Sequence, residues 1–265
     1  RQPVSGGNAA GFIHDLSFSV GGASIDPQDL NLAAQGLAGY NGAFLGIAPS
    51  GSVETLRLMY SFTAEASYRI TPWLALGLAV DYIRGSNASF VSYVGATSTD
   101  TFQARPSARI TPVRAIVRFY PGSGIYFRGS LGYYTAKAGY FYRFNQADSW
   151  QQWSGSATGH CFGAEVGAGG DWPISRGMAL FAEAGFRMAR VGGLTGSDLL
   201  TDSTGQSIAT SGPLWYFTKQ GADSRDYAML FIRSSKPAEA GVVDARRAEL
   251  NLSGTMFKAG IRIRF

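Results

Sequence analysis

Few side chains in this sequence belong to the types that do chemistry on their own. The chain has two histidines, His14 and His160, and one cysteine, Cys161. A nucleophilic cysteine needs an adjacent base that takes its proton. On an alternating strand His160 and Cys161 point to opposite faces, so this histidine cannot serve as that base. We therefore expect structural roles for both residues, and a single cysteine excludes an internal disulfide or a metal cluster of cysteines.

Two further patterns resemble ligand sites only superficially. Gly167-Ala168-Gly169-Gly170 is glycine-rich like a phosphate loop, but no lysine with a serine or threonine follows it. Five aspartates lie between residues 192 and 246, and their spacing matches no compact calcium loop. We expect them to form a solvated acidic loop, and we expect no metal and no cofactor. These aspartates are Asp198, Asp202, Asp223, Asp226 and Asp244.

The basic residues do not indicate nucleic acid. The net charge is +5, and the 23 lysines and arginines are mostly arginines. They stand singly along alternating segments and form none of the runs that nucleic-acid patches show. The planar arginine fork binds carboxylates bidentately, so this preference fits buried ion pairs.

Alternation of apolar and polar residues recurs along the chain and predicts strands. The clearest case runs from Leu56 to Ile70, where Leu58, Tyr60 and Phe62 alternate with polar residues. No segment approaches the ~18 unbroken apolar residues of a membrane-spanning helix, whereas a tilted strand spans a bilayer with ~9–11 residues. The predicted strands lie near 12–20, 56–70, 74–82, 113–120, 125–134, 162–172, 178–188 and 257–265.

The connections between these strands alternate strictly between short and long. The long ones cover 21–54, 86–107, 144–157 and 192–246. This asymmetry is typical of a transmembrane antiparallel up-and-down β-barrel with short periplasmic turns and long extracellular loops. We predict an all-β fold, a single domain over 1–265 with eight strands, and a periplasmic tail at 1–10.

Two long connections carry structural signals of their own. Asp26-Pro27-Gln28 is typical of a helix start. The runs 214–218 and 227–232 could pair as a hairpin in the loop 192–246. We expect this hairpin to protrude above the membrane; the alternative is a ten-stranded barrel that includes it.

The inward positions of the predicted strands carry fifteen charges. A barrel of about eight strands has room inside only for side chains, and isolated buried charges are too costly to remain unpaired. We expect an ion-pair network that plugs the lumen; the alternative is a narrow ion path that favours anions. The residues are Asp15, Arg57, Glu65, Arg69, Asp81, Arg114, Arg118, Arg128, Glu165, Asp171, Glu183, Arg187, Lys258, Arg262 and Arg264.

The strand rhythm, the hairpin Tyr68 to Leu74 and the aromatic ending at Phe265 resemble the OmpA/OmpX-like superfamily of small outer-membrane barrels, which includes opacity-type proteins. The resemblance implies the bacterial outer membrane, with its lipid and lipopolysaccharide as surroundings. It also implies an assembly signal that the barrel assembly machinery reads, formed by Phe257, Ile261, Ile263 and Phe265. Because the sequence starts at Arg1, we expect a mature chain without its signal peptide; the alternative is that the sequence begins within a longer chain.

Architecture alone does not assign an activity. We expect a non-enzymatic protein whose extracellular loops contact a partner, such as another envelope or surface protein. One alternative is a narrow channel or transporter. Another is a lipid-modifying enzyme, although His160-Cys161-Phe162 lacks the serine two positions on that lipid A deacylases show. The aromatic residues expected at the contact are Trp150, Trp153, Trp215, Tyr216 and Phe217.

Overall fold

The structure is a computed structural model that describes residues 15–96, 98–122 and 124–265. Its strands form one 15-stranded sheet in which every pairing is antiparallel. This confirms the predicted all-β class. Within the described residues, no helix is both long and apolar enough to cross a membrane.

Eight strands, which we call the ring, each pair with two other members of the same set. The path runs β8-β9-β15-β1-β2-β3-β6-β7, and β7 pairs in turn with β8. At the end near Phe265 the connections β2–β3, β6–β7 and β8–β9 are short. At the other end β1–β2, β3–β6 and β9–β15 are joined by long connections, whereas β7 and β8 are joined by the short turn 146–149. The ring strands are β1 (Asp15–Ser24), β2 (Leu58–Thr71), β3 (Leu74–Ser86), β6 (Ser107–Phe119), β7 (Ile125–Asn145), β8 (Trp150–Ser175), β9 (Met178–Val191) and β15 (Gly254–Arg264).

The ring carries polar side chains on its buried face and apolar side chains on its exposed face, which is the reverse of the arrangement in a water-soluble protein. Along β2 the buried positions from Ser61 to Ser67 are polar or charged, whereas Phe62 between them is 51 % exposed. Because successive side chains of a strand point to opposite faces, this alternation gives a charged inner face and an apolar outer face.

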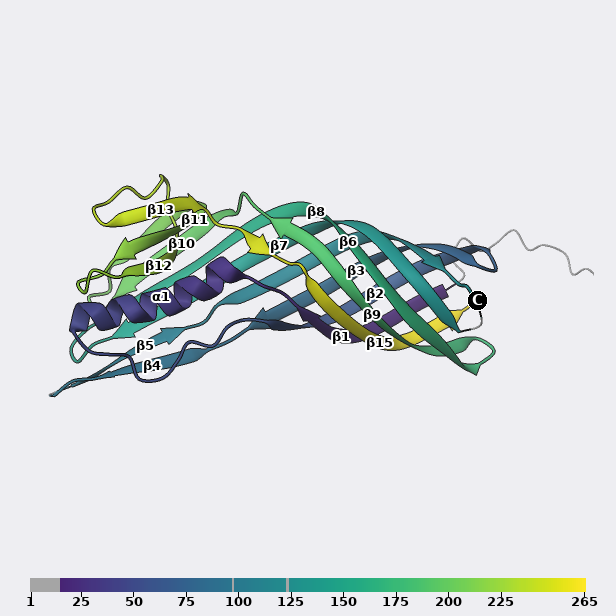
Figure 1. Cartoon of the computed structure of the whole chain (residues 1–265), viewed down its shortest axis with the longest axis horizontal. Helices are drawn as coiled ribbons and strands as arrows, with labels where there is room; N and C mark the ends of the chain where they lie inside the picture. The colour runs from purple at the N-terminus through teal and green to yellow at the C-terminus, as the bar shows by residue number, and fades with distance from the viewer. Residues whose placement is uncertain (1–14, 97, 123) are drawn as a thin grey trace, which may run out of the picture.

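The long connections fold into a second body, which we call the cap, at the end of the ring away from Phe265 (Figure 1). The distal parts of β7 and β8 extend into it, and β5 and β10 pair with these extensions. The cap has its own apolar core of buried helix and strand residues. Its elements are α1 (Gln28–Leu45), β4 (Ser89–Val94), β5 (Thr99–Ala104), β10 (Thr195–Asp202), β11 (Ser207–Gln220), β12 (Asp226–Ile232), β13 (Val242–Arg247) and β14 (Leu250–Asn251).

Helix α1 begins directly after Pro27, as the sequence predicts, and packs on β12. Gly36 permits this close approach, because a Cβ there would lie 2.5 Å from the backbone nitrogen of Ala228. The Asn31 side chain ties the helix to the segment before β2, since its Oδ1 accepts the amide of Leu56 at 2.8 Å. The helix is therefore an integral part of the cap core.

The structure decides two predictions about the loops, the hairpin within 192–246 and the loop 144–157. The runs 214–218 and 227–232 do pair as a hairpin, β11 with β12, and neither strand belongs to the ring. The predicted loop 144–157 is wrong, because β7 and β8 stay paired as far as Asn145 and Trp150. Their distal side chains are buried by the cap, so pairing continues past the length that the ring requires. The predicted tail 1–10 and His14 lie outside the described residues.

Candidate functional site

The inner face of the ring holds a network of charges centred on Arg114 of β6. The Arg114 Nη2 donates to Asp81 Oδ1 at 2.7 Å, and Nη1 donates to Glu165. Glu165 also accepts from Nη2 of Arg128 at 2.6 Å, and Arg128 donates to Glu183 through Nη1. All five side chains are buried, so each charge is balanced by a neighbour from another strand.

Four more residues extend this layer. Arg118 Nη2 donates to Glu65 at 2.6 Å and lies 3.9 Å from Glu183. The Lys258 Nζ lies 3.6 Å from Asp81, and the Tyr126 hydroxyl donates to Glu183 at 3.2 Å. The bidentate and bridging geometry is typical of arginine in buried ion pairs.

A second layer lies toward the short connections, where β15 ends and β1 begins. Arg262 Nη1 donates to Asp171 Oδ1 at 2.6 Å, and Arg264 Nη2 donates to the other Asp171 oxygen at 3.0 Å. The Arg264 Nε lies 4.0 Å from Asp15. The Arg262 guanidinium also lies over the ring of Tyr126, 5.2 Å from its centroid.

Charges balance across the two layers. Removing one partner of such a pair leaves an uncompensated buried charge, which is strongly destabilising. Six carboxylates face six bases, namely Asp15, Glu65, Asp81, Glu165, Asp171 and Glu183 with Arg114, Arg118, Arg128, Lys258, Arg262 and Arg264.

Three predicted members of the network do not take part in its ion pairs. Arg57 is exposed, because β2 begins one residue later and the preceding Leu56 enters the cap core. Arg69 is half-buried and lies over Tyr120 at 4.4 Å. Arg187 is buried, but it donates to backbone carbonyls, including that of Leu252 at 2.7 Å, because this level of the ring adjoins cap backbone.

The cap contains a cavity of about 410 Å³ between α1, the β11–β12 hairpin and the distal ends of β7 and β8. Its walls are mainly aromatic and aliphatic, and they include Tyr40, Trp153 and Phe231. Two cations, Lys219 and Arg233, also line it. An apolar pocket with a few polar groups is the usual form of a ligand site. Arg233 already makes an ion pair with Glu239, so the charge that an anionic group would meet is mainly that of Lys219.

Two of the five predicted contact aromatics are buried in the cap. Trp215 is only 8 % exposed and Phe217 only 1 %, so a surface role for them is wrong. Both lie on β11, which pairs with β10, β12 and β13 and so directs its rings into the cap core. Trp150, Trp153 and Tyr216 are half-buried.

The exposed apolar residues of the cap are not the aromatic residues predicted for the contact. Phe44 near the end of α1 and Phe90 on β4 are exposed, as are Val94 and Ile208. Both faces of β4 carry apolar side chains, because Val91 and Tyr93 are buried opposite the exposed Phe90 and Val94, so alternation could not have identified the exposed positions.

One aspartate of the predicted acidic loop is buried rather than solvated. Asp198 Oδ2 accepts from the Tyr140 hydroxyl at 2.7 Å, and the Tyr140 oxygen accepts the amide of Ile232 at 3.0 Å. Burial raises the pKa of Asp198 above its ordinary value of 3.8. This bridge joins three cap strands, β7, β10 and β12, through one carboxylate.

The side chains considered for catalysis are not assembled into a site. His160 is exposed and its ring lies 5.5 Å from that of Tyr133, while Cys161 is a free, half-buried thiol. Gly167 lies within β8, where a Cβ would meet the Ala184 carbonyl at 2.7 Å, so close strand packing accounts for this glycine. Within the described residues no histidine, cysteine or acidic groups gather in a way that could hold a metal ion.

Comparison with known proteins gives similarity at the level of structure. No family model matches the chain, and no curated protein matches it. The crystal structure of Acinetobacter baumannii CarO is similar with a TM-score of 0.35 and 14% sequence identity, covering 83% of this chain and 96% of that chain. This similarity assigns no function to the protein.

Proposed function

We propose that this protein is an integral outer-membrane protein, a closed antiparallel barrel of eight strands with a sealed lumen. In this proposal it has no catalytic activity and acts through its extracellular cap. The observation that carries the proposal is the inverted ring, with paired charges on its buried face and large apolar side chains on its exposed face.

The outer face supports membrane insertion. Its exposed residues include Phe18, Phe62, Leu78, Phe127 and Leu180, which come from five ring strands. Apolar surface in water costs roughly 25 cal/mol per Å², and a patch of this extent marks contact with lipid or protein. A continuous band around a ring fits lipid, because a lipid phase surrounds a barrel on all sides.

Aromatic residues border the band on both sides. Tyr68, Trp73 and Trp172 are exposed near the short connections, while Tyr60 and Tyr133 are exposed toward the cap. Transmembrane barrels carry such girdles where the bilayer meets water. On this basis we place the short connections in the periplasm and the cap outside the cell, with the barrel assembly machinery as the partner during insertion.

The charge network favours a closed lumen over a channel. Arg114, Arg118 and Arg128 are all buried, and each makes an ion pair with a carboxylate two strands away around the ring. A permeant ion would have to separate these pairs, and breaking a buried pair costs several kcal/mol. The role of the protein is therefore structural or recognitional.

The cap supports recognition as that role. Its cavity combines aromatic walls with Lys219 and Arg233, and its outer surface exposes Phe44 and Phe90. Exposed aromatic residues on a rigid element are typical anchors of protein interfaces. We propose that the partner is another envelope or surface protein that docks on the cap.

Reconstitution tests the proposal directly. The purified protein is folded into lipid vesicles, insertion is judged by protease protection of the ring, and ion flow is recorded in planar bilayers. We expect protected strands and no conductance. Lack of protection would reject membrane insertion, and reproducible conductance steps would show that the barrel is a channel and is not sealed.

Mass spectrometry of lipid A from cells with and without the protein tests the alternative that the protein is a lipid-modifying enzyme. We expect identical spectra.

A further inference from the structure

A row of positive charges crosses three neighbouring strands on the outer face of the ring. Arg84 of β3 is directly opposite Arg109 of β6, and Arg109 is directly opposite Lys137 of β7. All three side chains are exposed. Like charges directly opposite each other on adjacent strands are destabilising, so the row needs a compensating anion.

No protein group supplies that anion. Within the described residues, the ion pairs and side-chain hydrogen bonds involve none of Arg84, Arg109 and Lys137. This is the opposite of the inner face of the same strands, where Arg114 and its neighbours are paired. The row is therefore an uncompensated cationic site.

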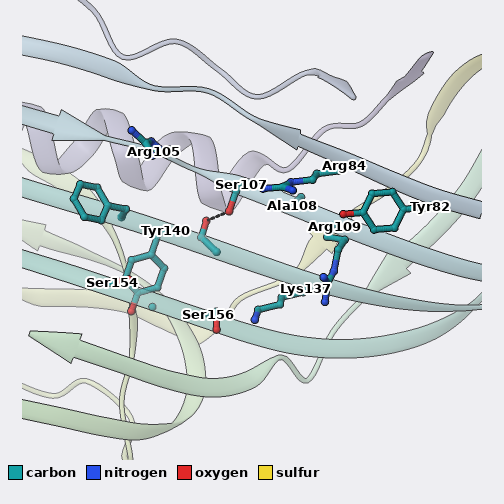
Figure 2. A pocket seen from close by; sticks show the side chains of 13 residues that line it. Tyr82, Arg84, Arg105, Ser107, Ala108, Arg109, Lys137, Tyr140, Ser154 and Ser156 are labelled. Atoms are coloured by element: carbon teal, nitrogen blue, oxygen red, sulfur yellow. Dashed lines mark hydrogen bonds between the residues drawn. The ribbon is translucent and has the colours of Figure 1, made fainter. Parts of the chain in front are cut away.

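The row lines a depression of about 350 Å³, whose lining side chains are drawn in Figure 2 and include Tyr140 and Ser154 from the distal parts of β7 and β8. Its lining adds a fourth base, Arg105, and the hydroxyl groups of Ser107, Ser154 and Ser156. Gly139 keeps the floor open, because a Cβ there would lie 2.6 Å from Ser107 Oγ. Guanidinium, ammonium and hydroxyl groups are all donors, and together they suit phosphate oxygens.

The position of the depression identifies the kind of molecule that carries the phosphate. Tyr60 of the aromatic girdle is opposite Arg84, so the row lies at the cap-side border of the apolar band. An apolar groove of about 830 Å³, lined by Val80, Phe62 and Phe18 among others, adjoins it on the outer face, and Tyr82 lines both. The combined surface has donors at headgroup depth and an apolar groove at acyl-chain depth.

We propose that this surface is a binding site for the phosphorylated headgroup of lipid A in the outer leaflet, with the acyl chains along the adjoining groove. Arg84, Arg109 and Lys137 contact the phosphates, and the serine hydroxyls contact the sugar or phosphate oxygens. This inference rests on the proposed function, because it requires the ring to span the outer membrane with the cap outside.

The test compares three proteins. The site variant carries Arg84→Ala, Arg109→Ala and Lys137→Ala. The control variant removes the same charges far from the site, with Arg176→Ala, Arg225→Ala and Lys236→Ala, all of which are exposed. Each protein is first folded into phosphatidylcholine vesicles and checked for protease protection. Failure of all three at this step would reject the proposed function, whereas normal insertion leaves only the lipid site in question.

Binding is then measured by native mass spectrometry in detergent, titrated with bisphosphorylated lipid A. Each basic residue near an anionic lipid surface adds to the free energy of binding, so replacing all three should weaken the affinity for lipid A by about 100-fold. We expect that loss in the site variant, wild-type affinity in the control, and weak binding of dephosphorylated lipid A to wild type. Equal affinity of the site variant and the control, or equal binding of dephosphorylated lipid A, would overturn the proposal. Tight binding of inorganic phosphate in competition with lipid A would show that free phosphate is the ligand instead.

Discussion

Glu183 is the carboxylate whose removal tests the interior network most directly. It pairs with Arg128, accepts from Tyr126 and lies near Arg118. Glu183→Ala leaves Arg128 with Glu165 alone, and breaking a buried pair in this way costs ~3–5 kcal/mol. We expect denaturant unfolding in lipid vesicles to show that loss, with no conductance in planar bilayers.

Two further variants serve as controls for the effect of Glu183→Ala. Glu249→Ala breaks an exposed pair with Arg190 and should cost only about 0–1 kcal/mol. Adding Arg128→Met to Glu183→Ala removes the stranded charge and should restore part of the stability. Unchanged stability of Glu183→Ala together with altered conductance would indicate a hydrated, conducting lumen.

Asp198 makes the cap sensitive to pH. Burial raises the pKa of its carboxyl above 3.8, so the folded protein keeps this proton where the unfolded chain has lost it. Because the folded protein holds this proton more tightly, the stability of the cap is highest below the pKa that Asp198 has in the unfolded chain. It falls as the pH rises through the pKa that Asp198 has in the folded protein. Asp198→Asn keeps an acceptor for the Tyr140 hydroxyl and should remove this dependence.

Hydrogen exchange of the Ile232 amide, which donates to the Tyr140 oxygen, measures the effect once intrinsic exchange rates are corrected for pH. Protection should fall with rising pH in wild type and stay level in Asp198→Asn. A parallel decline in both proteins would show that Asp198 does not control the opening of the cap.

Among the elements, the pair β3–β6 offers a clear probe of the outer face. Leu76 and Val117 are opposite each other in register and are 44 % and 46 % exposed. If lipid covers these side chains near the bilayer midplane, Leu76→Arg and Val117→Arg should each lower the free energy of unfolding by ~2–4 kcal/mol. Denaturant unfolding in vesicles gives the comparison.

Leu199 on β10 of the cap provides the matched control, because it is also 44 % exposed. Leu199→Arg should change stability by no more than about 0.5 kcal/mol, as most surface substitutions do. Equal effects at all three positions would mean that the outer face of the ring meets water, as the cap surface does.

For the whole molecule, the proposed orientation places every long connection outside the cell. Ser203 in the cap and Ser175 at the end of β8 are both exposed and lie at opposite ends of the molecule. In a Cys161→Ala background, Ser203→Cys should react with a membrane-impermeant maleimide on intact cells. Ser175→Cys should react only after the outer membrane is permeabilised. The opposite pattern would invert the proposed topology.

Alternation by itself determined the class and most strands of this fold. Because a strand repeats every two residues, the pattern at Leu58, Tyr60 and Phe62 also determines which side chains share a face. Most charges of the interior network could be assigned from that parity alone. The helix after Pro27 and the β11–β12 hairpin followed equally from local signals.

Only the tertiary structure decided what each face meets. Trp215 and Phe217 resemble contact residues in sequence, but β13 and β12 flank β11 and turn these rings into a core. Arg57 has inward parity, yet Leu56 is drawn into the cap and the alternation is broken there. Strand register brings Arg84, Arg109 and Lys137 into one row from three strands. Pairing between distant segments depends on the whole sheet, so a local pattern cannot specify it.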